Sequence, residues 1–265
     1  MSKTLALLLL SYWLKMKFKR YIPLFFVNFC FFLALSSACA EEINVVTEYL
    51  EPYQIKNHDG SLGGFSTEVV QALFAITGDT ANIKVMPWAR AYEIATHQKN
   101  TLIFSIARTK KREKLFRWVG GITRERLYFW GLKSKFLQPV TAIEQLKSKR
   151  IAASRKSNAE QYLIANNFKH IYPLVAEDQT MKMLYRDRVD LIVGTDKTFQ
   201  ARAEKLSFEF DKIVKIIEIK DLNADLSLAF NLHTDDKIMT RYQAAFKQLE
   251  ASGRLEKIQK KWLIH

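Results

Sequence analysis

Hydrophobic positions from residue 43 onward alternate between short continuous runs and runs with helical spacing. The short apolar runs 43–48 (INVVTE) and 102–107 (LIFSIA) predict strands. In 63–78 (GGFSTEVVQALFAITG) the apolar residues recur at the spacing of one helix face, and Gly78 is a stop signal. This alternation predicts an α/β fold with a mainly parallel sheet, in which ligand sites lie at the carboxyl ends of the strands.

The same alternation continues to the end of the chain. Further strands are expected at 82–87, 127–132, 150–154, 171–176, 190–195 and 225–232. Further helices are expected at 87–98, from Ser157 or Asn158, through Met183 and Leu184, from Asp196, at 235–252 and at 254–263.

The strands 127–132 and 225–232 are candidates for crossing between two lobes. They bracket a block of about 90 residues, which is near the small end of the domain range. We therefore expect residues 41–130 and 225–265 to form one lobe and residues 131–224 to form the other. A chain that leaves one lobe, builds a second and returns is suited to hinge closure over a ligand.

The N-terminus has the three-part layout of a secretory signal peptide. Residues 16–40 (MKFKRYIPLFFVNFCFFLALSSACA) give a basic head, an apolar run and a small-x-small cleavage pattern. We expect residues 1–40 to be this signal peptide, with Met16 as a candidate working start, and the mature chain to be periplasmic. A membrane-anchored N-terminus and a lipoprotein anchor at Cys39 are the alternatives.

The net charge of the chain indicates different partners depending on whether the chain is secreted. The 265 residues carry a net charge of +14 and are 48% hydrophobic, and such a basic excess usually raises nucleic acid or an anionic membrane as a partner. Removal of residues 1–40 takes away five basic residues and no acid, which leaves +9, and it also removes both cysteines. A secreted chain meets little nucleic acid, so we expect a solvated basic surface and no nucleic-acid partner.

Metal and cofactor signatures are missing from the sequence. The five histidines show no ligand spacing, and no Gly-x-Ser-x-Gly motif, phosphate loop or dinucleotide fingerprint occurs. We expect no metal, no cofactor and no catalytic residues.

The stretch 108–120 (RTKKREKLFRWVG) has six basic residues and one acid. It reads as a polyanion-binding patch, as a solvated charged segment, or as a place where one arginine is kept for a small anion. A guanidinium presents a planar fork that matches a carboxylate with two hydrogen bonds.

Four stretches stand in the order and at the spacings of a known family. They are 51–73 (EPYQIKNHDGSLGGFSTEVVQAL), the helix that starts at Trp88, 104–120 (FSIARTKKREKLFRWVG) and 252–263 (SGRLEKIQKKWL). Through them the chain resembles the family 3 (polar amino-acid type) bacterial periplasmic solute-binding proteins of ABC importers, over residues 43–265. The resemblance implies a two-lobed class II fold of the Venus flytrap kind, with two crossover hinge strands, that closes on a small solute.

The resemblance also implies a set of ligand-binding residues. In the family, aromatic rings sandwich the solute, a serine ends the third strand, an arginine in a Thr-x-x-Arg pattern grips the solute carboxylate, and a hydroxyl residue starts a helix of the second lobe. The matching residues here are Tyr49, Tyr53, Trp88, Ser105, Arg112 and Ser157. Simpler readings are a core pair for Trp88 with Tyr92, which share a helix face, and a plain helix cap for Ser157.

The chain departs from the family pattern at the cation end of the solute. The acid that usually pairs with the solute ammonium falls on Thr195, and the adjacent Asp196 is its candidate replacement. In the Gly-Phe-Asp-x-Asp motif, residues 64–68 read GFSTE, so one acid is missing. These departures put α-amino-acid specificity in doubt but leave the carboxylate end intact.

Three functions fit the sequence. The first is a monomeric, non-enzymatic receptor that passes a small carboxylate-bearing solute to the membrane permease of an ABC transporter. The second is a sensory or orphan binding protein that reports to a signalling partner. The third is a dehydratase-type enzyme on the same fold, which requires an acid in the cleft, with Glu68 and Asp196 as candidates.

Overall fold

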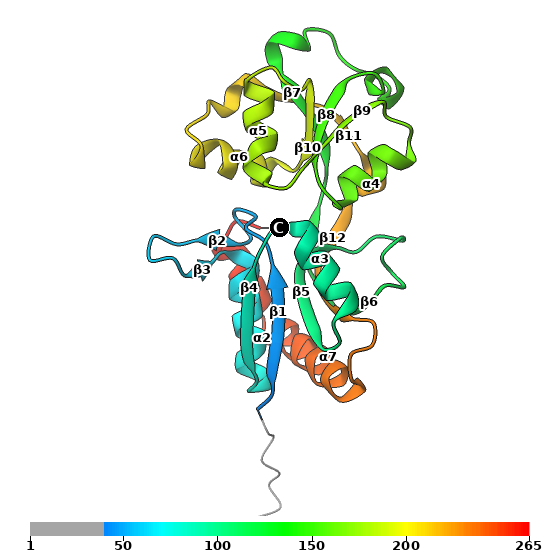
Figure 1. Ribbon diagram of the computed structural model, residues 1–265. Helices are drawn as coiled ribbons and strands as arrows, with labels where there is room; N and C mark the ends of the chain where they lie inside the picture. The colour runs from blue at the N-terminus through cyan, green and yellow to red at the C-terminus, as the bar shows by residue number, and fades with distance from the viewer. Residues whose placement is uncertain (1–39, 265) are drawn as a thin grey trace, which may run out of the picture. The chain divides into compact units, whose positions relative to one another are not determined.

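A computed structural model describes residues 40–264, and residues 41–264 lie in one compact unit (Figure 1). The predicted signal peptide therefore lies outside the described residues, apart from Ala40. Within the described part the chain builds two five-stranded sheets and one two-stranded hairpin.

The first sheet has four strands that run in one direction and one strand that runs against them. In spatial order it consists of β4 (Thr80–Val85), β1 (Glu42–Thr47), β5 (Thr101–Ala107), β12 (Ala224–Asn231) and β6 (Phe116–Glu125). Strands β4, β1 and β5 are parallel, whereas β12 is antiparallel to both β5 and β6. Four of the five strands, β6 included, therefore run in one direction, in agreement with the expectation of a mainly parallel sheet. Strand β12 re-enters the sheet from the second half of the fold and runs against its neighbours.

The second sheet has the same mixed character. Its order is β11 (Ile213–Glu218), β7 (Tyr128–Leu132), β10 (Leu191–Gly194), β8 (Arg150–Ser154) and β9 (His170–Leu174). Strands β10, β8 and β9 are parallel, and β7 is antiparallel to both β10 and β11. The separate hairpin pairs β2 (Ile55–Lys56) with β3 (Leu62–Gly63).

The chain passes between the two sheets twice. It leaves the first sheet after β6 and starts the second sheet with β7, and it returns between β11 and β12. The two predicted crossover segments are thus the strands that adjoin the two connections. Because both connections lie side by side at the ends of paired strands, they are placed as a double hinge.

Helices cover both faces of the first sheet. Helices α2 (Phe65–Thr77), α7 (Asp236–Ala251) and α8 (Arg254–Lys261) share one hydrophobic core, and α3 (Trp88–His97) packs on β1, β5 and β12 in a separate core. In the larger core the Tyr242 ring lies edge-on to Phe74 and Phe230, with ring centroids 5.5 and 5.0 Å apart. Such edge-to-face pairs add to the stability gained from burying the rings.

The second sheet is covered in the same way. Helix α4 (Asn158–Ala165) contributes to one core, and α5 (Glu177–Tyr185) and α6 (Asp196–Lys205) contribute to another. Four short 3₁₀ helices complete the fold: η1 (Lys133–Lys135), η2 (Ile143–Leu146), η3 (Phe210–Lys212) and η4 (Lys220–Leu222). Across residues 40–264, every helix is too short or too polar to traverse a lipid bilayer.

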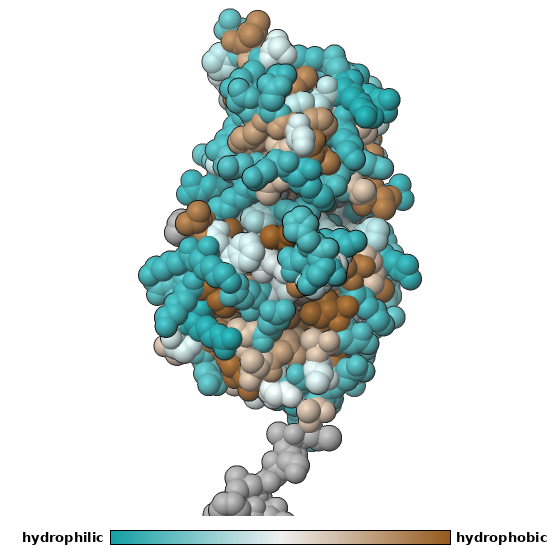
Figure 2. Space-filling view, turned by 90° about the vertical axis from the view of Figure 1, so that its left-hand side faces the viewer, coloured by the Kyte–Doolittle hydropathy of each residue, from teal (hydrophilic) through white to brown (hydrophobic). Residues whose placement is uncertain are grey.

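Exposed hydrophobic side chains are scattered over the surface. On the face shown in Figure 2 hydrophilic residues predominate, and hydrophobic ones form small separate groups. The most exposed large ones, Leu137, Leu263 and Ile164, come from three different segments of the chain. Isolated exposed hydrophobic residues are normal on a protein surface, unlike the large contiguous patches that mark obligate interfaces.

Candidate ligand-binding site

A cavity of about 120 Å³ lies where residues from both sheets converge. It is lined by Glu48 after β1, Ala107 at the end of β5, Ser154 at the end of β8 and Gly194 at the end of β10. These positions are the carboxyl ends of parallel strands, where ligands bind in open α/β sheets. The volume is of the same order as the ~150 Å³ cavity that holds a benzene molecule in another protein.

Six of the eight residues predicted from the sequence line this cavity: Tyr53, Trp88, Ser105, Arg112, Ser157 and Thr195. Tyr49 and Asp196 do not line it, and the neighbour Leu50 takes the position expected for Tyr49. The fold thus brings together residues that are more than 140 positions apart in the sequence. Their role in binding stays a prediction.

Arg112 is the buried member of the basic stretch. Its side chain is 1% exposed, and the guanidinium lies over the rings of Trp88 and Tyr92, at 5.4 and 5.0 Å from the ring centroids. One terminal nitrogen donates to the Ala107 carbonyl at 3.3 Å, while the buried Nε has no hydrogen-bond partner. Burial lowers the pKa of Arg112, an effect that Tyr92 opposes.

No carboxylate within the described chain forms an ion pair with Arg112. An isolated buried charge is costly unless it is paired, and within the described chain Arg112 lacks the compensation that an acid would give.

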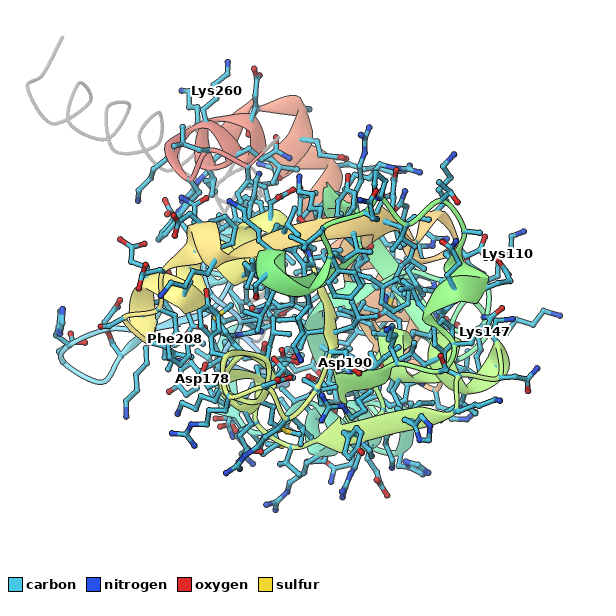
Figure 3. The ribbon with its side chains drawn as sticks, turned by 90° about the horizontal axis from the view of Figure 1, so that it is seen from above. Lys110, Lys147, Asp178, Asp190, Phe208 and Lys260 are labelled. Atoms are coloured by element: carbon cyan, nitrogen blue, oxygen red, sulfur yellow. The ribbon has the colours of Figure 1, made fainter. Side chains whose placement is uncertain are left out.

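The neighbours of Arg112 in the basic stretch face solvent. Arg108, Lys110, Lys111 and Lys114 are exposed, and Figure 3 shows Lys110 at the edge of the molecule, pointing outward. Arg108 pairs with Glu113 at 2.6 Å, an exposed contact. Most of this stretch is therefore a solvated surface, and one arginine is singled out by burial.

Trp88 ties the first half of the fold to the second. Its indole nitrogen donates to the Lys156 carbonyl at 3.1 Å, in the turn between β8 and α4. The ring also packs against Tyr92, with centroids 5.8 Å apart. Trp88 is thus both a wall of the cavity and a support beneath the Arg112 guanidinium, so the two readings of this residue are compatible.

Two further residues of the first half supply polar groups that are already engaged. The Ser105 hydroxyl accepts from Gln54 at 2.5 Å and donates to Ser66 at 2.8 Å. Ser105 also has a φ of 56°, a backbone conformation that non-glycine residues adopt rarely and that clusters at functional sites. The Tyr53 hydroxyl donates to a carboxylate oxygen of Glu125.

The second half contributes two helix N-termini. The Ser157 hydroxyl accepts from the Glu160 amide at 3.1 Å, which makes Ser157 the N-cap of α4, and Thr195 caps α6 in the same way through Thr198. Asp196 forms an ion pair with Lys215 at 2.7 Å and is about half exposed. The acid that was expected to replace the missing ammonium partner is therefore engaged outside the cavity.

Three acids and a second arginine that were not predicted from the sequence also line the cavity: Glu48, Glu125, Glu177 and Arg202. Arg202 is 1% exposed and pairs with Glu177 at 2.9 Å. Glu48 could have been found, because it directly follows a predicted strand in a chain whose ligand sites were expected at strand ends. The others sit in charged stretches that are typical of solvated surfaces, and only the fold buries them.

Glu48 carries a strongly perturbed carboxyl group. Burial raises its pKa well above the ordinary value near 4.5, Glu177 and Glu51 raise it further, and Arg202 lowers it. A raised pKa means that the folded state favours the protonated acid. The corresponding stability is fully present below the unfolded-state pKa and is lost as the pH rises through the folded-state pKa.

Replacement of Glu48 by glutamine is therefore expected to raise the thermal midpoint of the ligand-free protein more at about pH 8 than at about pH 5. The reason is that glutamine cannot ionise inside the cavity. The measurement is thermal unfolding of both proteins across that pH range. Glu42→Gln, an exposed acid on the same strand, is the matched control and is expected to show no such pH-dependent difference. Parallel pH curves for Glu48→Gln and the unchanged protein would refute the assignment.

The two acids that were named from the sequence as candidates for an enzymatic role lie outside the cavity. No group of three or more metal-binding side chains is present among residues 40–264. Glu68, one candidate acid for an enzymatic role, accepts from the Trp262 indole and from Lys261, both at 2.8 Å, and does not line the cavity. The other candidate, Asp196, is paired outside the cavity, as described above.

The two mixed sheets and the double connection between them are the fold of two-lobed periplasmic binding proteins, and comparison with solved structures agrees. A histidine kinase sensor domain with similarity to periplasmic binding proteins matches with a TM-score of 0.75 and 16% identity, covering 85% of this chain and 96% of that one. An ancestral arginine-binding protein bound to arginine matches with a TM-score of 0.73 and 17% identity, covering 83% and 97%. A putative L-cystine ABC transporter protein from Listeria monocytogenes matches with a TM-score of 0.72 and 20% identity, covering 84% and 96%.

The sequence itself matches a known family over its first part. Residues 43–128 match the bacterial extracellular solute-binding proteins, family 3. The resemblance predicted from the sequence is thereby confirmed. No curated protein matches this chain.

Proposed function

We propose that this protein is a periplasmic solute-binding protein that captures a small polar solute through its carboxylate and delivers it to the membrane permease of an ABC transporter. The solute is amino-acid-like, it enters between the two lobes, and Arg112 holds its carboxylate. The protein works as a monomer without cofactor or nucleic acid. It reaches the periplasm through the N-terminal signal peptide.

The observation that carries this proposal is the environment of Arg112. The guanidinium is buried, fixed over two aromatic rings, and lines the cavity without an acidic partner from residues 40–264. A solute carboxylate there forms a charge-assisted hydrogen bond of the strong, bidentate kind. The site thus selects an anionic group before any other feature of the solute is considered.

Two ion pairs connect the proposed lobes and support a closed form of the protein. In this proposal residues 41–130 with 225–265 form the first lobe and residues 131–224 form the second. On one side Lys156 of the second lobe pairs with Glu93 of the first at 2.6 Å, and on another Lys205 pairs with Glu51 at 2.8 Å. Such pairs stabilise the closed form, in which a permease recognises the lobes together with the enclosed solute.

A sensory role is the second candidate, and a specific comparison favours it. The histidine kinase sensor domain shares the fold over most of both chains. The two roles differ in what the closed lobes contact, a permease or a signalling receptor. Uptake of the bound solute by cells with and without the gene separates them, because only the transport role requires uptake to fall.

The proposal is tested by thermal-shift measurements on the mature chain against L-amino acids, short peptides and small organic acids. A solute that binds the native state raises the thermal midpoint by mass action. We expect at least one carboxylate-bearing compound to do so. If carboxylate-bearing compounds fail as a class while uncharged compounds succeed, the proposed anchoring is wrong.

Replacement of Lys205 by methionine is expected to weaken solute affinity by a factor of up to about five, since an exposed ion pair contributes about 0.2–1 kcal/mol. Methionine keeps the apolar stem but removes the pair with Glu51, so the closed form is less populated. Titration calorimetry at low and high salt measures the effect, which should shrink with salt. Lys212→Met removes a pair with Glu209 within one lobe and should leave affinity unchanged. Equal losses in both variants would argue against an interlobe role.

A further inference from the structure

The cavity is lined by a buried acid as well as by the buried Arg112, and neither side chain forms an ion pair within the described chain. Glu125, at the end of β6, is 6% exposed and lines the same cavity as Arg112. No lysine, arginine or histidine among the described residues forms an ion pair with it. Both groups carry the penalty of burial without the compensation of pairing.

The hydrogen bonds of Glu125 hold it in place without neutralising it. The fully buried Tyr53 donates its hydroxyl to the carboxylate, and the Tyr53 ring is fixed edge-on against Phe65, with centroids 6.1 Å apart. The Thr195 hydroxyl, at the N-cap of α6, acts on the same carboxylate. The Tyr53 hydroxyl thus orients an acid that still lacks a positive partner.

The other two acids of the cavity, Glu177 and Glu48, both feel the charge of Arg202, although only Glu177 forms an ion pair with it. Glu177 pairs with Arg202 at 2.9 Å, and the same arginine acts on Glu48. The positive charge of Lys197 lowers the pKa of Glu125. The Lys197 amino group, however, donates to the Leu263 carbonyl at 2.9 Å and forms no ion pair with any described acid. Glu125 is therefore the acid of this cavity that no arginine faces.

We infer that Glu125 is the residue that receives the cationic group of the solute, so that the site takes a zwitterion whose carboxylate lies on Arg112 and whose ammonium lies on Glu125. This inference rests on the proposed function and deepens it. The family places the ammonium partner in the second lobe, where this chain has Thr195. Here the acid comes from the hinge end of β6, and Thr195 lines the same cavity.

The ionisation of Glu125 fits this role. Burial raises its pKa, Tyr53 and Thr195 lower it through hydrogen bonds, Lys197 lowers it through its charge, and Asp196 raises it. A bound ammonium favours the ionised acid, so solute affinity is expected to fall as the pH decreases through the raised pKa. This pH dependence of solute affinity arises from the ionisation of Glu125, so it is expected to disappear when glutamine replaces Glu125.

The test compares each of the twenty common L-amino acids with the carboxylic acid that lacks its amino group. Thermal shift and calorimetry are measured on the unchanged protein, Glu125→Gln and Asp196→Asn. We expect an amino acid to bind the unchanged protein and its des-amino acid to bind about 30-fold more weakly or worse, since removing one partner of a buried charge pair has effects of that size. Glu125→Gln should lose this preference, and Asp196→Asn should keep it.

Glu125→Gln is expected to fold, because glutamine still accepts from Tyr53 and removes a buried charge. Its thermal midpoint without solute should not be lower than that of the unchanged protein. Equal binding of amino acids and des-amino acids by the unchanged protein overturns the inference while leaving the carboxylate proposal standing. Binding of neither class overturns both. A preference that survives in Glu125→Gln and disappears in Asp196→Asn moves the cation site to Asp196 and overturns the inference.

Discussion

Replacement of Arg112 by methionine is expected to weaken the binding of any carboxylate-bearing solute by about 30-fold or more. The guanidinium is the buried cation of the cavity without an acid among residues 40–264, so its removal leaves the solute carboxylate buried without a partner. Calorimetric titration of the best solute measures the loss. The thermal midpoint without solute is not expected to fall, because the same substitution removes an unpaired buried charge.

The matched control is Lys111→Met, one position away and exposed. It removes the same formal charge from the same stretch and should leave affinity unchanged. Arg112→Lys keeps the charge but loses the planar fork, and it should retain only part of the affinity. If Lys111→Met and Arg112→Met reduce affinity equally, the stretch acts through general electrostatics and Arg112 is not the anchor.

Replacement of Gly64 by alanine is expected to destabilise the protein by about 3 kcal/mol and to lower the thermal midpoint by roughly 6–12 °C. Gly64 has a φ of 101°, and an added Cβ would lie 2.5 Å from the Tyr53 carbonyl oxygen. The obstacle is backbone, which has no rotamer to change. The same carbonyl accepts from the Ser66 amide at 2.9 Å and caps α2, so a displaced Tyr53 also disturbs its contact with Glu125.

Gly60→Ala separates backbone strain from steric conflict. Gly60 also has a positive φ, of 83°, but a Cβ there would meet nothing within 4 Å. Strain alone predicts a loss of about 1 kcal/mol and no change in solute affinity. Chemical unfolding of both variants measures the difference, and equal losses would show that the contact with Tyr53 is unimportant.

Much of the fold could be predicted from the sequence because hydrophobic residues recur at the spacing of helices and strands, and because residues such as glycine mark where these elements end. The helix that begins after Gly64 and ends at Gly78 is an example of both signals together. Strand β6 was not predicted, since the glycines 120 and 121 interrupt its hydrophobic pattern. The first of them is required because a Cβ at Gly120 would lie 2.1 Å from the Phe246 ring, a packing demand that no local pattern reveals.

The candidate site also contains residues that the sequence could predict and residues that it could not. Arg112 and Trp88 stand in motifs whose spacing carries the family resemblance, and the fold brings both to the cavity. Glu125 lies in a charged segment, 124–127 (RERL), that is typical of an exposed turn. Its burial depends on Tyr53, which is 72 positions away, and on the second lobe, so only the assembled structure identifies it.

The most direct test of the account is a crystal structure of the mature chain with the solute that gives the largest thermal shift. We expect both carboxylate oxygens of the solute to lie within about 2.7–2.9 Å of Arg112 guanidinium nitrogens, inside the cavity between the two sheets. A solute that is bound elsewhere, or that turns its carboxylate away from Arg112, would contradict it.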